Sequence, residues 1–150
     1  MGECRMKYRE VPAGYQVTET FSVQTKITPV EDIITRFASL TTSGLLTISA
    51  LYFWDGASGP AIDKKIGWGW FSIKLTDTQV PSCVHDALAQ LMRQGLLDQK
   101  WLPYVNKLLN QMLKDRGMWW ARRRWWMRGL WLADGDFAKP ENVKKIYEAF

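Results

Sequence analysis

The chain has 150 residues, 47% of them apolar, and a formal net charge of +5. This length suits one domain with a sizeable core, and the apolar content argues against disorder. There is no apolar run of the roughly 18 residues needed to span a membrane, the charged N-terminus is unlike a secretory signal, and two cysteines are too few for a disulfide framework. We therefore expect a single domain over residues 1–150, in a reducing compartment and without a membrane span.

The first predicted elements are a strand and a helix. Apolar residues alternate along 16–27, which predicts a half-buried strand. The segment 28–37 then carries a helix-start signature, with Thr28 as N-cap, Pro29 at the first helical position and Glu31 completing a capping box. Its apolar residues follow the helical period, so a helix is predicted there.

The middle of the chain predicts more strands and then a helix. The β-rich apolar run at 45–54 predicts a strand buried on both faces and central in its sheet, and a third strand is expected near 69–75. Between them, the glycines and proline of 55–60 predict a tight loop. A helix is predicted at about 81–93, with its apolar face formed by Val84, Ala87, Leu88 and Leu91 and with Cys83 and Met92 at the edges.

The last third of the chain predicts three more helices. One follows Pro103 and ends before Gly117, with a stripe formed by Val105, Leu108, Leu109, Met112 and Leu113. The segment 118–131 favours a helix without a single apolar side, and the last helix is predicted at 140–150. The fold class is therefore α+β: one small antiparallel sheet, with strands near 16–27, 45–54 and 69–75, packed by four to five helices.

Three segments in order resemble the DUF1353 family of phage and prophage proteins. They are "FWDGASGP" (53–60), "VHDAL" (84–88) and "YVNKLLNQML" (104–113), the last followed by an Arg- and Trp-rich helix. The resemblance covers about 44–135 and implies a phage or prophage origin without implying a particular reaction. The chain departs from the family pattern at Gly59, Ala89 and Asn106, the last of which stands where the family has an acidic residue. The polar positions that the resemblance carries over are Asp55, Ser58, Pro60, His85 and Asp86.

The first candidate site is centred on His85, the chain's one histidine. Successive residues of a helix point about 100° apart, so we expect His85 to pair with Asp55 of the 55–60 loop rather than with Asp86. The pair would either staple the loop to the helix or form a pocket with Ser58 and Asp86 for a small ligand or hydrolysis. No cofactor is expected, although Asp55 and Asp86 could hold a divalent cation. A catalytic zinc site is disfavoured, because it normally draws on two or three His or Cys ligands.

The second candidate site is the Trp- and Arg-rich segment "WWARRRWWMR" (119–128), which contains no acidic residue. The tryptophans either pack onto the preceding helix, with arginine stems along the rings, or form a protein interface with Trp119, Arg123 and Trp126. Nucleic acid is disfavoured because no binding motif accompanies the modest net charge, and membrane-surface binding because the helix has no polar face for water.

The incomplete catalytic set favours binding over catalysis. The leading hypothesis is a small phage-encoded protein that binds a phage or host protein through the Trp/Arg helix, as a virion or assembly component or as a host-interacting factor. Its expected location is the virion or the host cytoplasm, and homo-oligomerisation is left open. The alternative is a hydrolase or small-ligand-binding protein that uses Asp55, His85 and Asp86.

Overall fold

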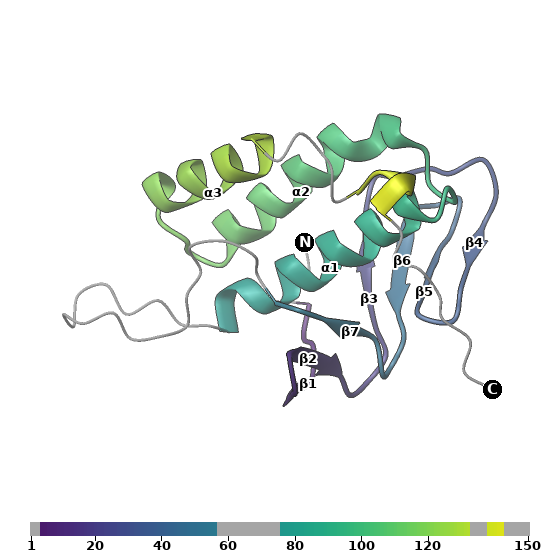
Figure 1. Ribbon diagram of the computed structural model, residues 1–150, viewed down its shortest axis with the longest axis horizontal. Coiled ribbons are helices and arrows are strands. Elements are labelled where there is room, and N and C mark those ends of the chain that lie inside the picture. Colours follow the sequence, from purple (N-terminus) through teal and green to yellow (C-terminus); the bar gives the residue numbers. More distant parts are fainter. Residues whose placement is uncertain (1–3, 57–75, 133–137, 143–150) are drawn as a thin grey trace.

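The computed structural model describes residues 4–56, 76–132 and 138–142. Within this part of the chain, two small antiparallel sheets lie beside three α-helices (Figure 1). One sheet has the order β1-β2-β7, with β1 Tyr8–Val11, β2 Gly14–Val17 and β7 Phe53–Trp54. The other has the order β3-β6-β5-β4, with β3 Phe21–Gln24, β4 Ile33–Ile34, β5 Ala38–Leu40 and β6 Leu45–Ile48. The helices are α1 Thr76–Arg93, α2 Leu102–Asp115 and α3 Trp120–Leu132, with 3-10 turns η1 Gln99–Trp101 and η3 Pro140–Asn142.

The α+β class with antiparallel pairing is confirmed, but the predicted single sheet and the four to five helices are wrong. The predicted strand near 69–75 lies outside the described residues, as does most of the predicted helix at 140–150. Of that helix, the structure describes only the short turn η3.

Both long predicted strands are divided between the two sheets. The stretch 16–27 contains the end of β2 and all of β3, and the run 45–54 contains β6 and β7. The second run turns at Leu51, which adopts a left-handed φ of 74° although nothing in "SAL" (49–51) marks a turn. β6 is internal in its sheet, as predicted, because it pairs with β3 on one side and β5 on the other.

The predicted helix at 28–37 is wrong, because the segment contains strand β4 instead. Ile33 and Ile34 pair with Leu40 and Ser39 of β5. A helix of ten residues is marginal without a buried face, and here Val30 and Ile34 of the expected apolar stripe are 98% and 81% exposed. Strand pairing therefore prevails over the capping signature.

The central element is α1, which is buried along almost its whole length (Figure 1). It begins at Thr76, five residues earlier than predicted, so Pro81 lies inside the helix. The predicted apolar residues of α1 are all buried and join one core cluster with side chains from both sheets and α2. The five-residue stripe predicted for α2 is also buried. No helix in the described part of the chain is long and apolar enough to cross a membrane.

Candidate functional site

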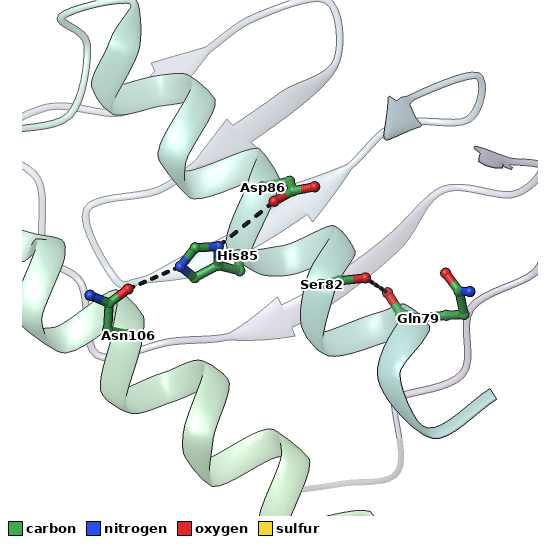
Figure 2. Close-up of polar contacts among 5 residues, drawn as sticks. All are labelled: Gln79, Ser82, His85, Asp86 and Asn106. Carbon is green, nitrogen blue, oxygen red and sulfur yellow. Dashed lines mark hydrogen bonds and ion pairs between the residues drawn. The ribbon is translucent and has the colours of Figure 1, made fainter. Parts of the chain in front are cut away.

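His85 lies in the contact between α1 and α2 (Figure 2). Its side chain is 6% exposed, and its Nε2 is 3.0 Å from Asn106 Oδ1 on α2. Since this acceptor is a carbonyl oxygen, Nε2 carries the proton of the bond. The other ring nitrogen, Nδ1, faces Asp86 Oδ1 at 3.7 Å, which is longer than a hydrogen bond but short enough for an ion pair when the ring is protonated.

Asp86 is the electrostatically perturbed member of this cluster. Burial raises the pKa of its carboxyl above the usual value, and the contact with His85 opposes that rise. The negative charge of Asp55 raises the Asp86 pKa further, while Arg93 lowers it. Asp55 and Asp86 therefore interact electrostatically.

Tyr52 and Cys83 complete the surroundings of Asp86. Burial raises the pKa of the Tyr52 hydroxyl and of the Cys83 thiol, and the Asp86 charge raises both further. Both groups therefore stay neutral at neutral pH. The Cys83 side chain, expected at the edge of the apolar face of this helix, is fully buried, and a buried neutral thiol is a poor nucleophile.

The predicted pocket residues are brought together only in part. His85 and Asp86 lie in contact, and exposed Asp55 follows β7. Ser58 and Pro60 lie outside the described residues. The expectation that His85 would pair with Asp55 rather than with Asp86 is wrong about Asp86: the two side chains leave α1 in different directions, yet the Nδ1 edge of the ring still faces Asp86 (Figure 2).

Asn106 is the partner of His85 that the sequence did not identify. Its pairing with His85 depends on how α2 packs against α1, which no local pattern in the sequence shows. No cluster of three or more His, Cys, Asp or Glu side chains within the described ranges could hold a metal ion. Because the pKa of Asp86 is raised, protons compete with a cation for its carboxylate at low pH, which makes Asp86 a weaker cation ligand there.

The second site is α3, which lies outermost on α2 (Figure 1). Trp126 is 5% exposed and packs in a small cluster with Leu109, Leu113 and Met118. Arg123 donates from Nε to Asn110 Oδ1 at 3.2 Å and from Nη1 to the Met118 carbonyl at 2.9 Å. Two of the three predicted interface residues, Trp126 and Arg123, therefore hold α3 in place.

The outward side of α3 presents the remaining tryptophans. Trp119, the third predicted interface residue, directly precedes α3 and is exposed. Together with it, four tryptophans are 58–76% exposed: Trp119, Trp120, Trp125 and Trp131. At about 100° per residue, Arg124 and Arg128 lie near the middle of the outward side, with Trp125 on one flank and Trp120 and Trp131 on the other. The sequence could not show which tryptophan faces inward, because tryptophans occur all round the helix.

Comparison of the chain with protein-family models, with curated proteins and with solved structures finds no match in any of the three. The chemistry of these two sites is therefore the basis for inferring function.

Proposed function

We propose that this chain is a phage-encoded binding protein that attaches to another protein through the outward side of α3. The observation that carries the proposal is the set of four exposed tryptophans, three of them on α3 and Trp119 directly before it, with the helix anchored by a fifth, Trp126. Burying one large apolar side chain is worth about 1.5–3 kcal/mol, so this surface gains substantially when a partner covers it. Several large exposed apolar side chains on one element are typical of interaction sites.

The chemistry of α3 indicates what the partner offers. Trp and Arg are the residues most enriched among binding hot spots. Arg124 and Arg128 are exposed, and no acidic residue occurs from 116 to 132. The partner is therefore a protein that presents both apolar side chains and acidic residues to α3. The resemblance to DUF1353 supports a phage or host protein as partner and the virion or the host cytoplasm as location.

The test compares variants of the outward side of α3 with a matched control. The purified chain is immobilised, proteins from virions and from host extract are captured, and the affinity of each captured protein is measured. Trp125→Ala/Trp131→Ala and Arg124→Glu should each weaken binding at least tenfold, about 1.4 kcal/mol or more. The control Lys107→Glu makes the same charge change at an exposed position of α2 and should bind as the parent does.

Equal binding by parent and α3 variants would refute the proposal. A chain that instead bound single-stranded oligonucleotides or anionic lipid vesicles, with no protein captured, would replace the protein partner with a nucleic acid or a membrane surface.

A second candidate is a small-ligand or hydrolytic site at Asp55, His85 and Asp86. The supporting observation is a carboxyl of raised pKa in contact with an imidazole, a pairing enriched at functional sites. If this candidate holds, p-nitrophenyl esters or phosphates should be turned over by the parent and not by His85→Gln. If Asp55 and Asp86 hold a cation, Mn²⁺ should raise the melting temperature of the parent more than that of Asp55→Asn. If the parent shows neither turnover of these substrates nor a rise in melting temperature with Mn²⁺, this site is excluded.

A further inference from the structure

A groove of about 360 Å³ lies between the segment 28–34 and the residues 96–101 that lead from α1 into α2. Three apolar side chains that line it are exposed: Val30 (98%), Ile34 (81%) and Leu96 (48%). Apolar groups left in water beside a groove gain from burial by a partner. The volume lies near the lower end of the range for ligand pockets, about 300–1,000 Å³, so it suits one or two large side chains rather than a whole helix.

The same groove has an acidic border. Glu31, Asp32 and Asp98 line it together with a single lysine, Lys100. The backbone N–H of Lys100 donates to the Asp98 carboxylate and holds its pKa below the usual value, so Asp98 remains ionised at neutral pH. The border therefore carries an excess of negative charge.

The apolar side chains of the groove and its acidic border complement the side chains on the outward side of α3. The helix offers exposed tryptophan rings to an apolar groove, and it offers Arg124 and Arg128 to an acidic border. Arginine pairs well with carboxylates because its planar guanidinium matches their geometry. Within one molecule, α3 and the groove beside β4 lie at opposite ends of the long axis (Figure 1), so a chain cannot fill its own groove with α3.

We propose that α3 of one copy docks into the 28–34/96–101 groove of a second copy, with tryptophan rings in the groove and arginines against its acidic border. This inference rests on the proposed binding role of α3 and names its partner. Two different surfaces meet in such a contact, so copies join head to tail into a ring or an open filament, or reciprocally into a twofold dimer in which each α3 fills the other copy's groove.

The test is sedimentation velocity over a range of protein concentrations, with variants of either surface. The parent should show a mass that increases with concentration. Trp125→Ala/Trp131→Ala removes the α3 side of the contact, and Val30→Asp/Ile34→Asp removes the groove side through exposed positions. Each variant alone should remain monomeric at concentrations where the parent associates.

A mixture of the two variants gives the sharper result. The α3 variant keeps an intact groove and the groove variant keeps an intact α3, so together they should form a one-to-one dimer and no larger species. In a charge-swap version, Arg124→Glu and Glu31→Arg should each weaken self-association at least tenfold and should restore it when mixed. Controls are Leu51→Asp and Lys107→Glu, which change exposed residues outside both surfaces.

A parent that is monomeric at every concentration would overturn the inference. So would a groove variant that associates like the parent, or a variant mixture that forms no dimer. In these cases the proposed function stands if a phage or host protein binds the parent and the α3 variants bind it more weakly. Both proposals fail if the α3 variants bind every captured protein as tightly as the parent does.

Discussion

Protonation of the His85 ring decides how many of its neighbours it can bind. A neutral ring with its proton on Nε2 donates to Asn106 and turns a lone pair toward Asp86, whereas a doubly protonated ring donates to Asn106 and forms an ion pair with Asp86. Because the ring is buried, the loss of either partner reduces the stability of the fold. His85 thus links α1 to α2 whether or not it also takes part in a site.

The link between His85 and Asn106 can be measured with a double-mutant cycle. His85→Ala should reduce the free energy of unfolding by about 2 kcal/mol, because it removes a buried side chain and leaves Asn106 unpaired. The coupling energy between the His85 and Asn106 substitutions should be about 1 kcal/mol, measured by urea unfolding. Asn110→Ala, one helical turn along α2, should be additive with His85→Ala, since Asn110 binds Arg123 instead. Full additivity of the His85 and Asn106 substitutions would disprove the link.

The raised pKa of Asp86 predicts a specific dependence of stability on pH. The folded chain holds the Asp86 proton more tightly than the unfolded chain does. The carboxyl therefore contributes stability below the ordinary carboxyl pKa of about 4, and this contribution is lost as the pH rises through the raised value. Asp86→Asn should consequently melt at a higher temperature than the parent at neutral pH.

The melting temperatures of parent and Asp86→Asn should converge as the pH falls from 7 toward 4. Glu10→Gln, at an exposed strand position, should show a constant difference from the parent over the same range. A less stable Asp86→Asn at neutral pH would mean that the ion pair with His85 outweighs the cost of burial.

The sequence could predict which residues belong to the candidate pocket, but not how they are arranged. His85 and Asp86 are adjacent in the chain, so their contact is local. Asn106 is 21 residues away and on another helix, and only the packing of α2 on α1 brings it to the ring. Helical geometry gave the direction of each side chain from α1, but not which neighbour would meet it.

At the scale of elements, the connection between α2 and α3 shows how a glycine can fix a helix end. Gly117 has a φ of +82°, its N–H donates to the Lys114 carbonyl, and the next N–H, of Met118, donates to the Leu113 carbonyl. This is a Schellman motif, and Met118 and Leu113 also share the apolar cluster beneath α3. The turn therefore directs α3 back along α2.

Two glycine substitutions should have opposite effects on stability. Gly117→Ala should destabilise the fold by about 1–2 kcal/mol, because an L-residue is strained in the left-handed region, although no atom lies near the added Cβ. Gly129→Ala lies inside α3 with open space around it and should stabilise by about 0.5–1 kcal/mol. Both changes in the free energy of unfolding are to be measured from the midpoints of denaturant unfolding. A loss of stability from Gly129→Ala would contradict the helical assignment there.

The elements that the sequence predicted correctly are those whose burial follows a single periodicity. The α2 stripe recurs through four turns, and a glycine marks its end. At 28–37 the same kind of pattern was misleading, because the capping signature describes only local preference and Ile33 and Ile34 gained strand pairing with β5. The division of 45–54 was invisible for a related reason: an unbroken apolar run does not show where the chain changes sheets.

At the scale of the whole molecule, the described chain has two apolar clusters of unequal size. The larger one joins side chains from both sheets, α1 and α2. The smaller one holds α3 to α2 through Trp126, Leu109, Leu113 and Met118, with Leu130 at its edge. The proposed binding surface therefore lies on an element that packs in the smaller cluster and not in the main core. An element of this kind opens at lower free energy than the core.

Hydrogen exchange should resolve this difference in stability. Amides of α3 should exchange faster than those of α1, whose slowest amides report global unfolding. Trp126→Ala removes the main buried side chain of α3 and should cost about 3 kcal/mol, which accelerates α3 exchange by about a hundredfold. Trp125→Ala, one residue earlier and exposed, should change α3 exchange by less than about twofold. Because global unfolding also breaks the Trp126 contacts, the slowest α1 amides should accelerate in Trp126→Ala as well, and they should stay near the parent rate in Trp125→Ala. If the amides of α3 and α1 exchanged at the same rate in the parent, α3 would belong to the same cooperative unit as the core, and its exposed tryptophans would be displayed on a rigid support.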